Sequence, residues 1–171
     1  MDMIAERLAA IPLLADLTPE QRHRLSRAAE RLFIAPGKTL VDRGEVADAA
    51  YLCLDDNIAA EYITDGESEV VMLPQGSTVL EMAMIVETEA VARFSADAHA
   101  RVVRLSREKL LRIIGQDPAL AEALGDALTK RLNEAVGQMR ELSTVFAEPR
   151  GVAPSGEEVA DAVAADDRVS A

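Results

Sequence analysis

The chain has one cysteine, no tryptophan and no long uncharged run. A single thiol, Cys53, cannot form an internal disulfide and is typical of a reducing compartment. No segment approaches the roughly 20 apolar residues that a membrane-spanning helix needs. The first seven residues have neither the basic start nor the apolar run of a signal peptide. With 171 residues, 49% of them hydrophobic, the sequence predicts one soluble cytoplasmic domain with a core and a short appendage.

Positive charge is also scarce. The formal net charge is −12, and the densest basic group, Arg22, Arg24 and Arg27, lies in a segment with the pattern of an amphipathic helix. Duplex binding needs several Lys or Arg side chains on one face to displace counterions. Aromatic residues make up only 3% of the chain, which disfavours platforms for base stacking. We therefore expect no direct nucleic-acid partner.

Catalytic and metal-binding patterns are missing as well. The two histidines, His23 and His99, are far apart in the sequence, and neither has a neighbouring cysteine or serine that would suggest a nucleophile. Metal ligation would require several His or Cys residues together. There is no glycine pattern of the Walker or dinucleotide-binding type. The sequence predicts a protein that is not an enzyme and holds no metal.

Residues 1–29 form a predicted helical lead that is broken near Pro12. The second helix has a clear start signal: Thr18 can cap it, Pro19 suits the first helical position and Gln21 completes a capping box.

Residues 30–105 change to short extended segments separated by turns. We predict a hairpin turn at 55–57 and another turn at Asp65-Gly66. The run Tyr51–Leu54 is continuously apolar, which indicates a strand that is buried on both faces. Even spacing of short strands favours an antiparallel sandwich or barrel. The predicted strands are 31–34, 39–41, 51–54, 58–64, 69–73, 91–96 and 101–105.

Residues 106–146 are predicted to be helical again. Ser106 caps a helix that ends near Gly115, and Asp117 and Pro118 start a longer helix. Apolar residues then recur at spacings of three and four, in the manner of a heptad. We expect the first half of this row to pack on the chain's own barrel and the second half to contact a partner helix. The row comprises Leu124, Leu128, Leu132, Ala135, Met139, Leu142 and Phe146.

Residues 147–171 are rich in Ala, Gly, Pro and acidic residues and lack large apolar side chains. Such a composition cannot offset the entropy of ordering, so we predict a disordered acidic tail.

The segment 76–92 has the outline of a small-molecule pocket. A turn glycine, Gly76, is followed by a short apolar stretch with Glu81 inside it, and then by a loop. A pocket for an anion needs a cation or free backbone donors. This loop instead carries Glu87, Glu89 and Ala90.

Several segments together resemble the cyclic-nucleotide-binding domain family. They include the Pro36-Gly37 turn, the run Val41-Asp-Arg-Gly-Glu45 and the run Ala50-Tyr-Leu-Cys-Leu54. The leader Ile11-Pro-Leu-Leu14 and the junction Arg104–Leu111 are similar to the entry and the exit of the family's barrel. The resemblance covers about residues 11–146. It implies an α+β fold, namely an antiparallel β-roll or jelly-roll barrel of about eight short strands flanked by N-terminal helices and a long C-terminal helix.

The family's ligand site is a phosphate-binding cassette: a Gly-Glu pair, a short helix, then an Arg followed by a small or hydroxyl residue. Helix amides and the Arg meet the cyclic phosphate, and the Glu holds the ribose. On this chain Leu80-Glu81 stands in place of Gly-Glu, and the phosphate Arg falls on Ala90. Arg93 could replace it only if the loop shifted register, because its odd spacing from Ala90 directs it to the other face of a strand. The candidate pocket residues are Val79, Leu80, Glu81, Met82, Ala90, Val91 and Arg93.

Three interpretations remain open. The first is a non-catalytic regulatory module with a degenerate pocket and no cofactor, which dimerises and contacts an unidentified protein. The second is a ligand sensor that accepts cAMP, cGMP or a less anionic molecule in a pocket lined by Leu80, Met82 and Met84. The third is a fragment of a transcription regulator, which the acidic end of the chain disfavours. The residues expected at the dimer interface are Leu132, Ala135, Met139, Leu142 and Phe146.

Overall fold

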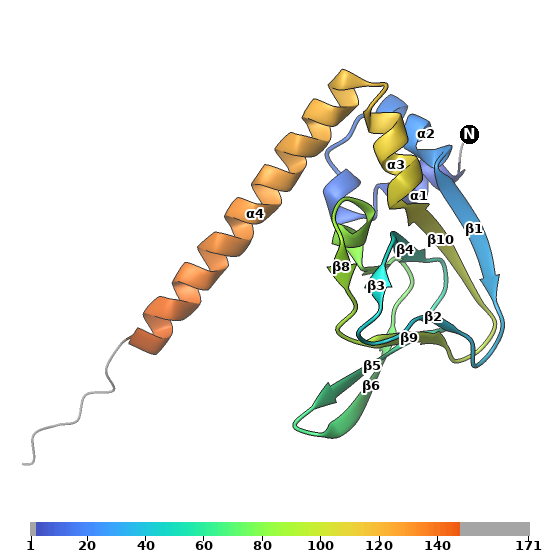
Figure 1. The fold of residues 1–171 in the computed structure, drawn as a ribbon, viewed down its shortest axis with the longest axis vertical. Helices are drawn as coiled ribbons and strands as arrows, with labels where there is room; N and C mark the ends of the chain where they lie inside the picture. Colours follow the sequence, from blue (N-terminus) through green and yellow to red (C-terminus); the bar gives the residue numbers. More distant parts are fainter. Residues whose placement is uncertain (1–2, 148–171) are drawn as a thin grey trace, which may run out of the picture. The chain divides into compact units, whose positions relative to one another are not determined.

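A computed structural model describes residues 3–147 (Figure 1). The N-terminal lead contains helix α1 (Met3–Leu8), the 3-10 helix η1 (Pro12–Leu14) and helix α2 (Pro19–Ser26). The predicted capping box at the start of α2 is present: the Gln21 N–H donates to Thr18 Oγ1 at 3.2 Å, and the Thr18 N–H donates to Gln21 Oε1 at 2.9 Å. This start of a helix was therefore readable from four consecutive residues.

Short antiparallel strands make up the middle of the chain (Figure 1). They form two four-stranded sheets, in the orders β1-β10-β4-β7 and β2-β9-β5-β6, and a small pair, β3-β8. Together with the helices they confirm the predicted α+β roll. In the described part of the chain the strands are β1 (Ala29–Ile34), β2 (Thr39–Val41), β3 (Val46–Ala47), β4 (Ala49–Cys53), β5 (Ile58–Thr64), β6 (Glu67–Leu73), β7 (Thr78–Val79), β8 (Thr88–Glu89), β9 (Arg93–Ala96) and β10 (Ala100–Ser106).

Strand β4 lies between two hydrophobic clusters, and all five of its residues are buried. Ala50 and Leu52 belong to a cluster shared with the helices, which we call the helical core. Tyr51 and Cys53 point the other way, into a second cluster that fills the roll, which we call the barrel core. The alternation follows from the two-residue period of a strand. Burial raises the pKa of the Cys53 thiol to about 11, so the thiol is protonated at neutral pH.

The hairpin predicted at residues 55–57 is wrong. β4 and β5 belong to different sheets, so this segment crosses from one sheet to the other. Asp55 Oδ2 accepts a hydrogen bond from the Arg101 N–H at 2.9 Å, and Asn57 Nδ2 donates to the His99 carbonyl at 2.8 Å. The polar side chains therefore bind the crossing to the start of β10 and to the residue just before it. Local turn preference could not reveal which strands pair.

The turn predicted at Asp65-Gly66 is confirmed. Both residues have positive φ, 53° and 84°, and they join β5 to β6 in an antiparallel pair. This hairpin extends below the rest of the strands in Figure 1. β6 is exposed over nearly its whole length.

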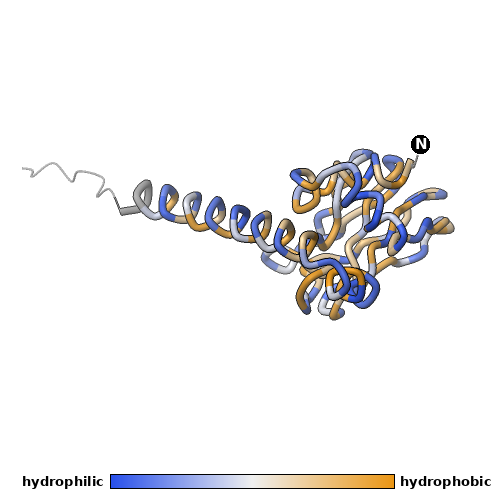
Figure 2. Tube along the Cα trace, turned by 90° about the horizontal axis from the view of Figure 1, so that it is seen from above, coloured by the Kyte–Doolittle hydropathy of each residue, from blue (hydrophilic) through white to orange (hydrophobic). Residues whose placement is uncertain are grey.

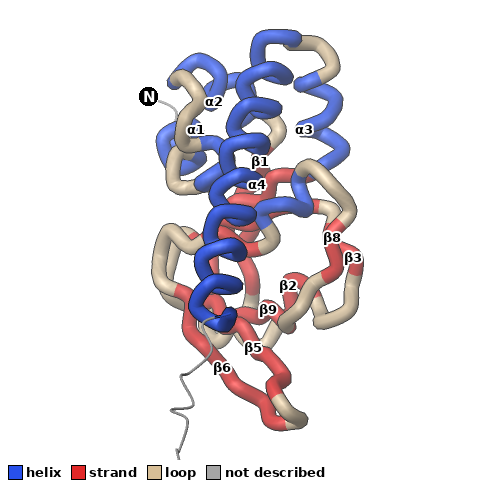
Figure 3. Tube along the Cα trace, turned by 90° about the vertical axis from the view of Figure 1, so that its left-hand side faces the viewer, coloured by secondary structure: helices blue, strands red, loops and turns tan. Residues whose placement is uncertain are grey.

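Two helices follow β10. Helix α3 (Arg107–Ile114) begins at Ser106, whose Oγ accepts from the Lys109 N–H at 3.4 Å, and it ends at Gly115. Helix α4 (Pro118–Ala147) begins after Asp117, whose Oδ1 accepts from the Leu120 N–H at 3.1 Å. Figure 3 shows α1, α2 and α3 gathered at one end of the strands.

The first turns of α4 contribute to the helical core. Leu120, Leu124 and Ala127 are buried there, and Leu128 packs against it. This agrees with the expectation for the first half of the apolar row. The described residues divide into two units, one that ends at Glu134 and one that begins at Ala135. The predicted division at residues 29, 105 and 146 stays a prediction. The proposed acidic tail lies outside the described residues, except for its first residue, Ala147, which ends α4.

None of the helices described has the length and apolar character required to cross a bilayer.

Candidate functional site

The cassette segment begins at a tight turn and ends at β9. Gly76, with φ of 87°, leads into β7, and the 3-10 helix η2 (Glu81–Met84) follows. β7 pairs with β4 and β8 pairs with β3, so the segment is anchored to the barrel on both sides of η2. The sequence predicted only a loop between the short helix and β9, because two-residue strands carry too few residues to show a period.

Leu80 has an unusual backbone conformation for its residue type. It is the N-cap residue of η2 and has φ of 56° and ψ of 44°, in the left-handed region. A side chain with a Cβ is disfavoured there by about 1–2 kcal/mol, whereas glycine is not. The family motif that the sequence resembles has glycine at this position, and Leu80 adopts the left-handed bend that glycine suits best.

Glu81 connects three elements instead of facing an open pocket. Its Oε1 accepts from the Leu13 N–H at 2.5 Å, and its Oε2 pairs with Arg131 Nη2 at 2.7 Å. The Glu81 side chain is only 13% exposed. Glu81 therefore does not face solvent, and its carboxylate caps the start of η1 and not that of η2. Both carboxylate oxygens already have cationic or N–H partners.

The position expected for the phosphate Arg lies inside the roll. Ala90 is 2% exposed, and its backbone N–H and carbonyl bond to Glu45 and Gly44. Its neighbours in the barrel core are uncharged residues: Val41, Ala47, Ala49, Tyr51, Cys53, Ile58, Ala60, Val79, Ala83, Ala92, Phe94, Ala96, Ala100 and Val102. Val91, the next candidate, is 74% exposed.

Arg93 lies on the outside of the roll. Its Nε pairs with Asp42 Oδ1 at 2.9 Å, and its Nη1 approaches Glu61 Oε2 at 3.5 Å. The hydrogen bond that Arg93 donates to Asp42 raises the pKa of Arg93 and lowers the pKa of Asp42. These residues line a hollow of about 260 Å³ with Arg43 and Ile63. Two carboxylates thus already pair with Arg93, the arginine that the sequence offered as a replacement at this site.

The residues of η2 divide between the two cores. Leu80 and Ala83 pack in the barrel core with Val79, whereas Met84 is fully buried in the helical core. Met82 is partly exposed. Leu80 and Met84, two of the three residues expected to line one pocket, thus pack in different cores.

The expected dimer row is exposed where it is described. Leu132, Met139 and Leu142 are 63%, 69% and 58% exposed, and Ala135 is exposed as well. The backbone of Phe146 is helical, but its side chain lies outside the described ones. Figure 2 shows apolar residues recurring along the described part of α4.

Among residues 3–147 there is no cluster of three His, Cys, Asp or Glu side chains that could hold a metal ion. Sequence reasoning missed the partners of Glu81. Leu13 and Arg131 are 68 and 50 residues away along the chain, and no local pattern connects them.

No family model matches the chain. Individual proteins do. The cAMP-dependent protein kinase regulatory subunit of Colletotrichum orbiculare is 28% identical over 113 residues, which are 66% of this chain and 29% of that protein. The corresponding subunit of Yarrowia lipolytica is 31% identical over 109 residues, 63% of this chain and 28% of that protein. The chain thus spans under a third of the length of these relatives.

One solved structure matches this chain over nearly the whole of the solved chain's length. The cyclic nucleotide-binding-like protein of Brucella abortus is 30% identical and superposes with a TM-score of 0.60, over 67% of this chain and 99% of that one. A roll with a cassette between β7 and β9 and this degree of similarity define the class. The chain belongs to the cyclic-nucleotide-binding domain family. Its relatives are regulatory and non-catalytic, in agreement with the prediction that it is not an enzyme.

Proposed function

We propose that this chain is a regulatory module of the cyclic-nucleotide-binding type that no longer binds cyclic nucleotides, and that it acts by dimerising and contacting another protein. The observation that carries the proposal is Ala90, an uncharged residue that is 2% exposed and packs among hydrophobic side chains, at the position where the family motif has its phosphate-binding Arg.

The missing cation has a large energetic effect. A hydrogen bond between charged groups contributes about 1.5–3 kcal/mol, and an unpaired buried phosphate costs more. Since about 1.4 kcal/mol is a factor of ten in affinity, loss of the Arg alone weakens binding by roughly 10- to 100-fold or more. Glu87 and Glu89, both exposed on the cassette loop, add repulsion toward an anion.

The ribose contact is lost for a different reason. Glu81 would have to leave Leu13 and Arg131 before it could accept a ribose hydroxyl. Leu80 also places a side chain where the motif has only backbone. These features support a cassette whose remaining role is to hold the helices to the barrel.

Two features support action through protein contacts. The relatives are named as regulatory subunits of a kinase. The row on α4 exposes Leu132, Met139 and Leu142, large apolar side chains at heptad-like spacing.

Isothermal titration calorimetry with cAMP and with cGMP tests the loss of binding. We expect no saturable heat at micromolar ligand. The matched variant combines Leu80→Gly with Ala90→Arg, which restores both motif residues, and we expect it to gain measurable binding of cAMP or cGMP. Micromolar binding by the unaltered chain would contradict the proposal and favour a working ligand sensor.

A further inference from the structure

A groove between α2 and α3 concentrates positive charge on a strongly acidic protein. It has a volume of about 550 Å³ and is lined by Arg24, Arg27, Ala28, Lys109, Arg112, Ile113, Gln116 and Asp117. Four of these side chains are cationic and one is a carboxylate, although the whole chain has a net charge of −12. None of them belongs to the cassette.

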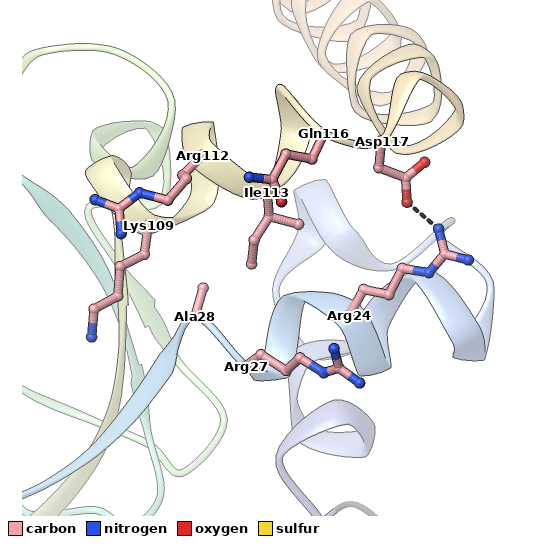
Figure 4. Close-up of a pocket in the computed structure, with 8 residues that line it drawn as sticks. All are labelled: Arg24, Arg27, Ala28, Lys109, Arg112, Ile113, Gln116 and Asp117. Carbon is pink, nitrogen blue, oxygen red and sulfur yellow. Dashed lines mark hydrogen bonds and ion pairs between the residues drawn. The ribbon is translucent and has the colours of Figure 1, made fainter.

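The cations stand on two sides of an apolar floor (Figure 4). Arg24 and Arg27 come from α2 and its end, and Lys109 and Arg112 come from α3. Ile113 points toward Ala28 between them, as Figure 4 shows. A single small anion would need donors that converge on one point. Here the charges are spread along a groove, which suits several negative groups along an extended ligand.

Two of the four cationic side chains in the groove are available to contact a partner. The Arg27 guanidinium has no hydrogen bond or ion pair with any described residue, and Arg27 is exposed. Arg112 pairs with Glu108 on the same helix at 2.7 Å, and both side chains are largely exposed. Such an exposed pair contributes little, so a carboxylate from a partner can replace Glu108 at small cost.

The other two cations have structural partners. Arg24 binds Asp117 and Glu20, and Lys109 binds Glu30. The hydrogen bond that Arg24 donates to Asp117 lowers the pKa of Asp117 and raises the pKa of Arg24. Arg24 and Lys109 therefore fix the walls of the groove, while Arg27 and Arg112 are the side chains free to contact a ligand.

We propose that this groove binds an acidic segment of a partner protein, in which carboxylate side chains contact Arg27 and Arg112 and an apolar side chain lies on Ala28 and Ile113. The inference rests on the proposed function only in that the module contacts a protein. Its test does not involve the cassette, so cAMP calorimetry and the experiment below fail independently.

The probe is a short fluorescein-labelled peptide rich in glutamate with one leucine, measured by fluorescence anisotropy. Its counterpart carries glutamine in place of every glutamate. We expect the acidic peptide to bind, the glutamine peptide not to bind, and added salt to weaken binding, since exposed charges are screened. Arg27→Glu combined with Arg112→Glu should weaken binding by about tenfold or more, because each reversal replaces an attraction by a repulsion.

Arg43→Glu combined with Arg140→Glu is the matched control, since both residues are exposed, neither lines the groove, and two arginine-to-glutamate reversals change the net charge by the same amount as in the test variant. It should leave binding unchanged. Circular dichroism checks that the variants fold. Equal binding by the double variant would overturn the proposal, as would no binding of the acidic peptide to the unaltered chain. A short DNA duplex that binds the groove more tightly than the peptide would also overturn it.

Discussion

At the scale of single residues, the backbone at Leu80 has a conformation that a leucine does not favour. Leu80 occupies the left-handed region, and its side chain is partly buried in the barrel core. Packing thus offsets the conformational cost of the non-glycine residue. A substitution that removes these packing contacts but keeps a Cβ should therefore lower the free energy of unfolding.

We therefore expect Leu80→Gly to be more stable than Leu80→Ala by about 1 kcal/mol. Both variants lose the same apolar contacts, but only the alanine variant keeps a Cβ in the left-handed region. Urea unfolding monitored by circular dichroism measures the difference. If alanine proved as good as glycine at this position, Leu80 would not be held in the left-handed conformation.

Gly125 provides a control with the opposite expected order. It lies inside α4, where a Cβ would meet nothing within 4 Å. Gly125→Ala should stabilise the protein by about 1 kcal/mol, because glycine is a poor residue within a helix. The two positions together separate backbone strain from a general effect of glycine.

At the scale of elements, the sequence was sufficient to locate features that depend on neighbouring residues, such as caps and turns, but not to show which distant segments pair. The cap residues Thr18 and Ser106 and the turn Asp65-Gly66 act on their own neighbours, so the sequence was sufficient to locate them. The crossing at 55–57 depends on strands far away along the chain, and a turn sequence does not distinguish a hairpin from a crossing. The short strands β3, β7 and β8 were missed for a similar reason, since two residues show no alternation.

The candidate site shows the same limit. The sequence predicted the Leu80, Glu81 and Ala90 positions through spacing relative to the family motif. It could not predict that Glu81 binds Leu13 and Arg131, because these contacts depend on how η1 and α4 pack against η2. The predicted and the observed surroundings therefore differ most for Glu81.

The contact between Glu81 and Arg131 should contribute to stability as a coupled pair. In a double-mutant cycle of Glu81→Gln and Arg131→Met, we expect a coupling energy of about 0.5–1 kcal/mol, since the Arg131 side chain is 42% exposed and the Glu81 side chain only 13%. Glutamine keeps an acceptor for the Leu13 N–H, and methionine keeps most of the arginine stem. Chemical denaturation of the four proteins gives the value.

The neighbouring pair Lys130–Asp16 is the internal control. It joins the same helix to the N-terminal lead at 2.9 Å, but both side chains are more than half exposed. The corresponding cycle should show a smaller coupling because water and salt screen the pair. Equal couplings for the two pairs would mean that the burial of Glu81 adds nothing.

At the scale of the whole molecule, the chain combines a high negative charge with an exposed apolar row. A net charge of −12 opposes association, whereas large apolar side chains on one face of a helix favour it. Leu132, Met139 and Leu142 lie on the same side of α4 by the geometry of a helix, and they lie beyond the turns that pack in the helical core. Which effect prevails decides whether the module is a dimer.

We expect the apolar row to prevail, giving a dimer that Leu142→Asp converts to a monomer. The substitution places a charge among the exposed apolar side chains, where association would bury it without a partner. Asn133→Asp adds the same charge on another side of the helix and should leave the dimer intact. Sedimentation velocity over a range of concentrations distinguishes the two species. An unaltered chain that sediments as a monomer at every concentration would exclude the homodimer, and a dimer that survives Leu142→Asp would place its interface elsewhere.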